Sequence, residues 1–319
     1  MEVFSIIAGN GWLIFVILLL GTISGIYSER AGIVNIAING FMILGAVSYT
    51  IISVIGTNII NDKQPISMWH QIYTIPLAGL ITGIFGLVFG FATIKLKSDQ
   101  SISGFAINIL ALGIGAVTLL SLRLFQNEGT AVTNYSSPEL AWEQSTISLK
   151  NIVSYKTVLL IIVAAVSFFS LWKTKWGLRF RAVGENPQAV DVAGINVYKI
   201  KWQATFICAV IAGIGGAIFA VSNLTEFSIT KNPRGLGFLA LAIMITSRWK
   251  VTYAILVSFV FAMLSSISIY GITQVKAIAT FKDLFSLIPF VIVFGILLSS
   301  RKGSVGPAAA GIPYDKSKR

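Results

Sequence analysis

The chain has 319 residues, of which 55% are hydrophobic and 11% charged, and its mean hydropathy is +0.82. A soluble domain carries about 25% charged residues, so the composition excludes a soluble enzyme, a disordered chain and a collagen-like fibre. The net charge of +12 is divided among short clusters between apolar runs, which is typical of membrane topology and not of nucleic-acid binding. The sequence therefore predicts an all-α, polytopic transmembrane bundle.

Apolar runs divide the chain into candidate membrane spans. A bilayer core of about 30 Å requires roughly 20 apolar residues per helix. No Lys or Arg precedes Arg30, so the first run is predicted to be a retained helix and not a cleavable signal. A shorter run, 235–247, is predicted to be a half-helix or one arm of a helical hairpin. In chain order the predicted spans are 11–27, 31–56, 74–94, 101–122, 157–172, 204–222, 251–270 and 285–300. We expect one domain over 1–319, with about eight to ten spans.

The distribution of Lys and Arg predicts the orientation. One set of alternate segments holds twice as many basic residues as the other, and the richer set is expected to face the cytoplasm. That set consists of 28–30, 95–100, 173–203, 248–250 and 301–319. The long loop 173–203 and the basic tail 301–319 are therefore predicted to be cytoplasmic, in a multi-pass protein of the cell membrane.

Missing motifs narrow the ways in which such a protein could be energised. The chain has no G-x-x-x-x-G-K-[ST] phosphate loop, and its twelve acids fall at span ends or in loops, whereas proton-driven carriers bury a titratable group in the membrane. A sodium-driven carrier could use backbone carbonyls at broken helices, so that alternative stays open. His70 is predicted to be a solvated loop residue, and no metal site or bound cofactor is expected. A partner is predicted to supply the energy.

The loop 173–203 carries its own helix signals. Asn186 suits an N-cap, Pro187 the first helical position and Gly194 the C-terminal cap. The helix 187–193 between them would be about 10 Å long. It could transmit force between two spans, or it could lie on anionic lipid with the help of neighbouring basic residues; both interpretations stay open.

Several separated stretches resemble permease subunits of ABC importers, in the family that handles branched-chain amino acids and simple sugars. They occur in the family's order at 28–46, 98–113, 181–189, 234–249 and 306–314. Their variants are most similar to the shorter of the two permeases of purine and general nucleoside importers. One position departs from the pattern: relatives commonly have an acid where this chain has Asn39, and an amide forms hydrogen bonds but cannot titrate.

The resemblance implies a transport subunit that is not itself an enzyme. It implies a second homologous permease as heterodimer partner, a cytoplasmic ABC ATPase that hydrolyses ATP, and an extracellular substrate-binding lipoprotein. It also implies two inverted halves, of which 32–46 and 235–249 are a weak echo. The implied cargo is a nucleoside, with purines favoured; simple sugars or branched-chain amino acids are the alternatives. The residues implied to couple transport to the ATPase are Gly184, Glu185, Asn186, Pro187, Ala189 and Gly194.

Uncharged polar residues inside the predicted spans suggest a pathway. Asn35 and Asn39 are four residues apart and would share a face of a helix over 31–56. Such amides and hydroxyls need either another helix or a wet cavity as partner, and helix packing explains them at least as well. Phenylalanines near them could stack on a base or could be ordinary core and lipid-facing residues. The predicted pathway residues are Asn35, Asn39, Ser101, Ser103, Asn108, Phe105 and Phe238.

Overall fold

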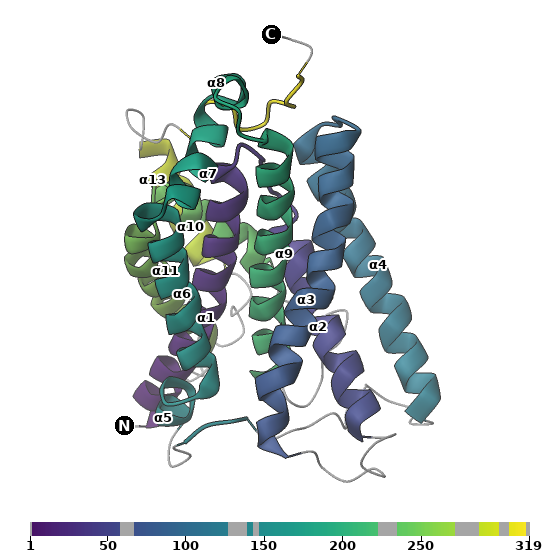
Figure 1. Ribbon diagram of the computed structural model, residues 1–319. Helices are drawn as coiled ribbons and strands as arrows, with labels where there is room; N and C mark the ends of the chain where they lie inside the picture. Colours follow the sequence, from purple (N-terminus) through teal and green to yellow (C-terminus); the bar gives the residue numbers. More distant parts are fainter. Residues whose placement is uncertain are drawn as a thin grey trace.

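The computed structural model describes residues 2–57, 67–126, 139–142, 147–222, 235–271, 287–299 and 306–316. Within those ranges every regular element is a helix, apart from an isolated β-bridge between Ala141 and Ser154. The helices run side by side as one elongated bundle (Figure 1). The predicted all-α class is confirmed.

The elements follow one another in the chain with few long connections among the described residues. They are α1 (Glu2–Arg30), α2 (Ile38–Ile55), η2 (Met68–His70), α3 (Gln71–Gly90), η3 (Phe91–Lys95), α4 (Gln100–Gln126), α5 (Ile147–Ile152), α6 (Tyr155–Lys173), α7 (Lys175–Glu185), α8 (Pro187–Val192), α9 (Val197–Ser222), α10 (Leu236–Thr246), α11 (Val251–Ser266), η5 (Ile267–Gly271) and α13 (Ile288–Ser299).

Seven helices in the described part of the chain are long and apolar enough to cross a bilayer: α1, α2, α3, α4, α6, α9 and α11. They correspond to the first seven predicted spans. The eighth predicted span, 285–300, contains the 12-residue α13, which is about 18 Å long at 1.5 Å per residue and too short to cross alone. The 11-residue α10 is the half-helix expected at 235–247.

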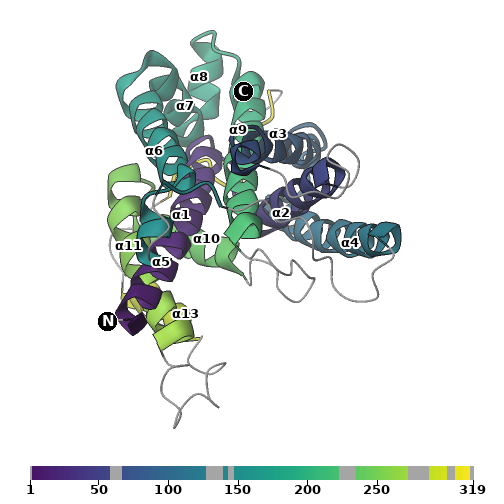
Figure 2. The same cartoon turned by 90° about the horizontal axis from the view of Figure 1, so that it is seen from below.

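Helices α1 and α9 form the middle of the bundle. Helices α2, α3 and α4 pack on one side of α9, and α6, α10 and α11 gather around α1 on the other (Figures 1 and 2). Figure 2 shows α4 at the outer edge. The chain's termini lie at opposite ends of the bundle (Figure 1). We name these ends the α8 end, where the C-terminal segment lies, and the α5 end, where α1 begins.

Glycines let α2 and α9 approach until their backbones touch. A methyl group on Gly216 would overlap the carbonyl of Met42, and one on Gly45 would overlap that of Gly213. Small residues at such contacts are the usual means by which membrane helices pack closely, since lipid gives them no hydrophobic driving force. Cys208 on the same helix is fully buried, which agrees with its predicted packing role.

Candidate functional site

The run 31–56, predicted as one helix, is helical only from Ile38 onward. Residues 31–37 form turns and irregular backbone, and Gly32 has a φ of +76°. The prediction that Asn35 and Asn39 share a helical face was therefore wrong. The buried Ile33 and Ala37 give this irregular segment the hydropathy of a helix, so the apolar pattern could not distinguish the two.

Side chains from neighbouring helices satisfy the irregular backbone of 31–37. The Asn108 side chain on α4 accepts a hydrogen bond from the Gly40 amide at 2.6 Å and donates one to the Ile36 carbonyl at 3.0 Å. Gln100 accepts from the Val34 amide at 2.7 Å, and Asn35 accepts from the Ala37 amide at 3.0 Å. Non-helical backbone at membrane depth needs such partners. Asn35 and Asn108 thus have a packing role in this structure.

Asn39 differs from these amides. It is 8% exposed, and its Oδ1 atom has no hydrogen-bond partner among the described residues. Gly237 in the first turn of α10 packs against it so closely that a methyl group on Gly237 would lie 2.5 Å from the Asn39 amide nitrogen. Helices α2 and α10 therefore begin beside each other, and each N-terminus carries a partial positive charge. We call this place, at Asn39 and Gly237, the helix-start junction.

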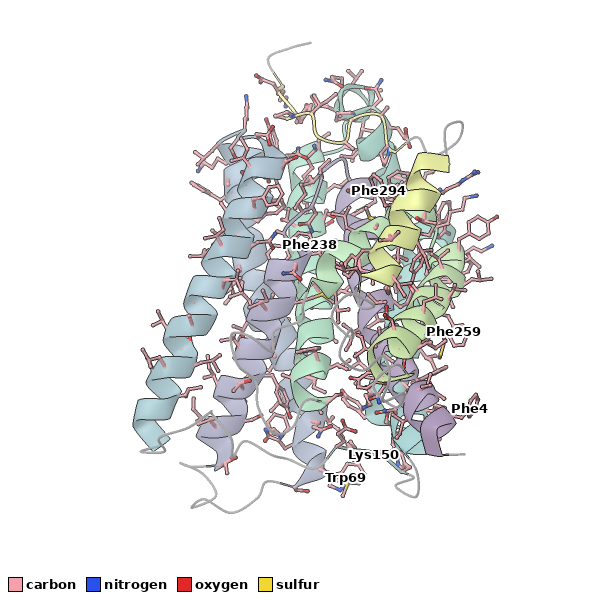
Figure 3. All side chains as sticks on the ribbon, turned by 180° about the vertical axis from the view of Figure 1, so that it is seen from behind. Phe4, Trp69, Lys150, Phe238, Phe259 and Phe294 are labelled. Atoms are coloured by element: carbon pink, nitrogen blue, oxygen red, sulfur yellow. The ribbon has the colours of Figure 1, made fainter. Side chains whose placement is uncertain are left out.

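The aromatic side chains near the junction have different surroundings. Phe41 is fully buried and packs edge-to-face on Phe89, with 6.1 Å between ring centroids. Phe238 is partly exposed and lies about midway between the two ends of the bundle (Figure 3). Phe105 is exposed on α4. Only Phe238 adjoins the helix-start junction through its neighbour Gly237.

The predicted serines lie at the beginning of α4 and not at the junction. Ser103 donates to the Asp99 carbonyl at 2.7 Å, and the Ser101 amide donates to the Asp99 carboxylate at 2.9 Å. Ser101 precedes Asn108 by two helical turns, or about 10 Å. Their hydrogen bonds help to begin the helix.

At the α8 end, the short helix has the caps that the sequence predicts. The Asn186 side chain accepts from the Ala189 amide at 3.0 Å, and Gly194 has a φ of +79° while its amide donates to the Asp191 carbonyl at 2.9 Å. Pro187 and Val190 face inward, whereas Ala189 and Val192 are exposed. The helix therefore presents a small apolar face to its surroundings.

Helix α7 was missed by the sequence analysis. Its N-cap is Thr174, whose hydroxyl accepts from the Gly177 amide at 3.0 Å. A Thr three residues before a Gly is a weak signal, so only the capping geometry reveals the start. The helix ends where Gly184 meets α1: a methyl group there would overlap the Arg30 carbonyl and lie 3.2 Å from the Gly32 amide nitrogen. The coupling loop thus touches the beginning of the 31–37 segment directly.

Polar contacts gather the ends of several helices around that point. The Glu29 carboxylate accepts from the Trp249 indole at 2.6 Å, and Arg30 donates to the Trp249 carbonyl at 3.3 Å. Lys201 on α9 donates to the Gly32 carbonyl at 3.3 Å. These bonds join α1, α9 and the turn after α10. The motif 234–249 and the motif 28–46, distant in sequence, therefore meet at the α8 end as well as at the helix-start junction.

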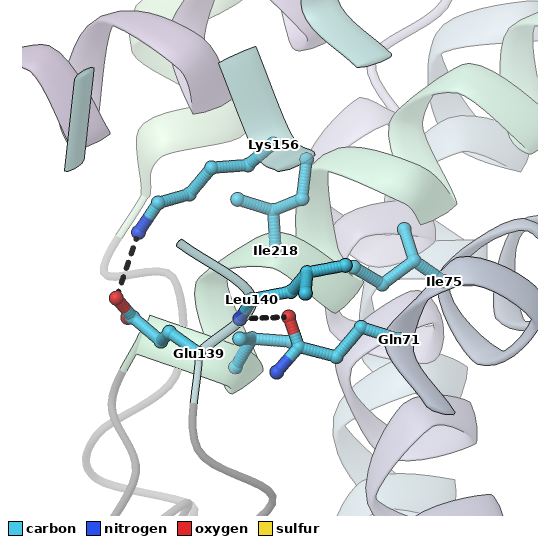
Figure 4. A pocket seen from close by; sticks show the side chains of 7 residues that line it. Gln71, Ile75, Glu139, Leu140, Lys156 and Ile218 are labelled. Atoms are coloured by element: carbon cyan, nitrogen blue, oxygen red, sulfur yellow. Dashed lines mark hydrogen bonds and ion pairs between the residues drawn. The ribbon is translucent and has the colours of Figure 1, made fainter. Parts of the chain in front are cut away.

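A buried ion pair lies at the α5 end (Figure 4). The Lys156 ammonium contacts the Glu139 carboxylate at 3.2 Å and donates to the Asn151 side chain at 2.7 Å. Gln71 at the start of α3 accepts from the Leu140 amide at 3.1 Å. The segment 139–142 thereby connects α3 with α6. The sequence analysis placed both charged residues in or near a loop and did not predict their pairing.

His70 was expected to be solvated, and this expectation was wrong. The residue is buried, with its ring centroid 6.2 Å from that of Tyr49 and 5.4 Å from that of Tyr73. The one-turn helix η2 turns it toward the bundle. Among the described residues there is no group of three or more His, Cys, Asp or Glu that could hold a metal ion.

Comparison with known proteins gives matches along nearly the whole chain. Residues 7–297 match the family described as "Branched-chain amino acid transport system / permease component". The nucleoside ABC transporter permease protein NupC of Lactococcus lactis is 31% identical, over 98% of both chains. The guanosine ABC transporter permease protein NupQ of Bacillus subtilis is 32% identical, over 95% of this chain and 94% of that protein. An uncharacterised Mycoplasma pneumoniae protein is 33% identical over 95% of this chain and 94% of its own. No solved structure matches.

Proposed function

The chain belongs to the family of permease components of branched-chain amino acid transport systems and is an ABC transporter permease, and from that premise we propose that it imports nucleosides, purine nucleosides foremost. The support is the similarity to NupC and NupQ along almost the entire chain. Their names specify nucleosides and guanosine. The family is one of membrane subunits, so ATP is hydrolysed by a partner and no cofactor is bound by this chain.

The helix-start junction suits a polar solute without charge. Asn39 contributes a buried carbonyl oxygen without a partner among the described residues, and such an atom accepts a hydrogen bond from an N–H or O–H of the solute. The N-termini of α2 and α10 add partial positive charge and no ionised group. Phe238, partly exposed beside the junction, could stack on a base, a contact worth about 1–3 kcal/mol in base-binding proteins.

The other predicted pathway residues hold lesser parts in this proposal. Asn35 and Asn108 position the beginning of α2, and Ser101 and Ser103 position the beginning of α4. Phe105 lies on the exposed face of α4, where the second permease of a heterodimer would cover it.

Energy enters, in this proposal, through α8. The contact of Gly184 with Arg30 and Gly32 is the observation that carries it. Because α7 and α8 share only Asn186 between them, a push on α8 displaces Gly184. The displacement passes to segment 31–37 and so to Asn39 at the helix-start junction. The α8 end and the C-terminus then face the cytoplasm and the ATPase, and the α5 end faces the substrate-binding lipoprotein outside the cell membrane.

Uptake by the reconstituted transporter tests the cargo. The chain, its partner permease, the ATPase and the binding lipoprotein are placed in vesicles, and uptake of labelled guanosine is followed with ATP present. We expect unlabelled adenosine and guanosine to compete, and ribose and leucine to have no effect. Competition by ribose or leucine without competition by nucleosides would reject the nucleoside assignment.

An ion-coupled carrier is the alternative of a different class. The same vesicles without the ATPase, under a sodium or proton gradient, test for it. We expect no guanosine uptake under either gradient. Uptake that needs a gradient and no ATP would replace the ABC mechanism.

A further inference from the structure

The C-terminal segment 306–316 is fixed across the α8 end of the bundle. The Ala309 amide donates to the Gly184 carbonyl at 2.8 Å, and the Ala308 amide donates to the Glu185 carboxylate at 3.3 Å. Further along, the ring of Tyr314 lies 5.2 Å from that of Tyr198 on α9. We call this segment the tail strap. It lies beside α8 without being part of a helix.

A groove separates the tail strap from the beginning of α8. One wall is formed by 185–188 and the other by 308–309 and 312–314, and the enclosed space is about 240 Å³. Glu185 is the charged residue among those that line it, and its side chain is 56% exposed. No Lys or Arg lines the groove, although the whole chain has twice as many basic as acidic residues. The groove is therefore an acidic site on a basic protein.

The walls also offer apolar surface. Ile312 is 59% exposed, and Pro187 and Pro313 complete the apolar lining. A Lys or Arg side chain has an aliphatic stem and a charged head, and it gains from both kinds of surface when the stem lies on apolar groups and the head reaches an acid. Arg30 approaches Glu185 from within the bundle at 3.8 Å, with its own side chain mostly buried. This leaves the outer side of the carboxylate open to a second cation.

We propose that this groove receives a Lys or Arg side chain of the partner ATPase, so that the tail strap and α8 together form the docking surface. This inference rests on the proposed function, because the partner is the ATPase of the importer. It assigns to the tail strap a role in binding, in addition to its contact with Gly184. It also explains why Glu185 is left half exposed beside apolar residues and not fully paired within the chain.

Cross-linking in the assembled transporter tests the position of the ATPase. The single cysteine, Cys208, is fully buried, so a cysteine introduced at the surface is the thiol that a photoreactive maleimide reaches. Ile312→Cys places the probe on the groove, and Leu96→Cys, exposed at the same end but outside the groove, is the control. We expect Ile312→Cys to link to an ATPase peptide that contains a Lys or Arg, and Leu96→Cys not to do so. Equal linking by both, or links from Ile312→Cys to lipid alone, would overturn the proposal.

Affinity gives a second measure with the same preparation. We expect Glu185→Gln to weaken retention of the ATPase by the permease pair about tenfold, as for loss of one charged partner at an interface, and Glu185→Asp to restore most of it. Unchanged retention in Glu185→Gln would overturn the groove proposal. If the unaltered permease pair itself retains no ATPase, the proposed function fails and not merely the groove.

Discussion

The two ends of the bundle are each bridged by a short non-helical segment, and the two bridges are built differently. At the α5 end, segment 139–142 is held by Lys156 and Glu139, whose side chains are 5% and 7% exposed. At the α8 end, the tail strap is held by main-chain hydrogen bonds and by exposed ion pairs such as Lys97 with Asp315, at 2.9 Å. Exposed pairs contribute little to stability, whereas a buried pair is costly to break.

This difference suggests where the subunit is fixed and where it can adjust. The α5 end joins α3 to α6 through a buried network (Figure 4), so its helices should move as one body there. At the α8 end the tail strap can shift without leaving a charge in an apolar environment. That end is also where Gly184 meets the 31–37 segment, as a moving input would require. The predictions below test this contrast, beginning with the largest effect.

Removal of one partner of the buried pair should have the largest effect on stability. Glu139→Ala leaves the Lys156 ammonium without its acid, and the free energy of unfolding should fall by about 3–5 kcal/mol. Unfolding in detergent, followed by thermal or chemical denaturation, measures it. The double variant Glu139→Leu with Lys156→Met should regain most of the loss, because no unpaired charge remains. A double variant as unstable as the single one would contradict this explanation.

A matched pair of Asn→Leu variants separates packing from transport. Asn108→Leu leaves the Gly40 amide and the Ile36 carbonyl without their partner, which should cost about 1–3 kcal/mol of stability for each group. Asn39→Leu removes an oxygen that has no partner among the described residues, so stability should hold while guanosine uptake falls about tenfold, the equivalent of one lost solute hydrogen bond.

The reverse pattern would move the pathway away from the helix-start junction. If Asn39→Leu lowered stability and left uptake unchanged, Asn39 would be a packing residue. Uptake and unfolding measured on the same purified preparations distinguish the two results.

The tail strap should give the smallest effect on stability. Asp315→Asn removes the charge that faces Lys97, a pair in which the side chains are 25% and 41% exposed. The free energy of unfolding should change by less than about 1 kcal/mol, and 0.5 M salt should produce no larger change in the unaltered protein. A loss comparable to that of Glu139→Ala would mean that the two bridges are equally firm.

The fold class followed from hydropathy, because lipid exposure demands long apolar helices and the chain supplies seven of them among the described residues. The α8 caps followed from Asn186, Pro187 and Gly194, whose side chains determine local backbone geometry. The break at 31–37 could not be predicted, because its buried residues are as apolar as those of a helix. The partners of its backbone, Gln100 and Asn108, come from another helix.

The ion pair and the tail strap were hidden for a related reason. Glu139 and Lys156 are separated by 16 intervening residues, and nothing in their local sequence specifies burial. Gly184 belonged to a recognised motif, but its contact with Arg30 depends on how α7 lies against α1. Local signals determine elements, whereas the sites that unite the elements depend on long-range packing.

The central claim is that force on α8 reaches the helix-start junction through Gly184. The direct test is ATP hydrolysis coupled to guanosine uptake in Gly184→Ala, with ATPase retention measured on the same complex. A methyl group at Gly184 meets the Arg30 backbone, whereas at Gly113 it meets nothing within 4 Å, so Gly113→Ala is the matched control. We predict that Gly184→Ala retains the ATPase but loses coupled hydrolysis and uptake, while Gly113→Ala keeps both. Normal coupling in an assembled Gly184→Ala transporter would contradict the account.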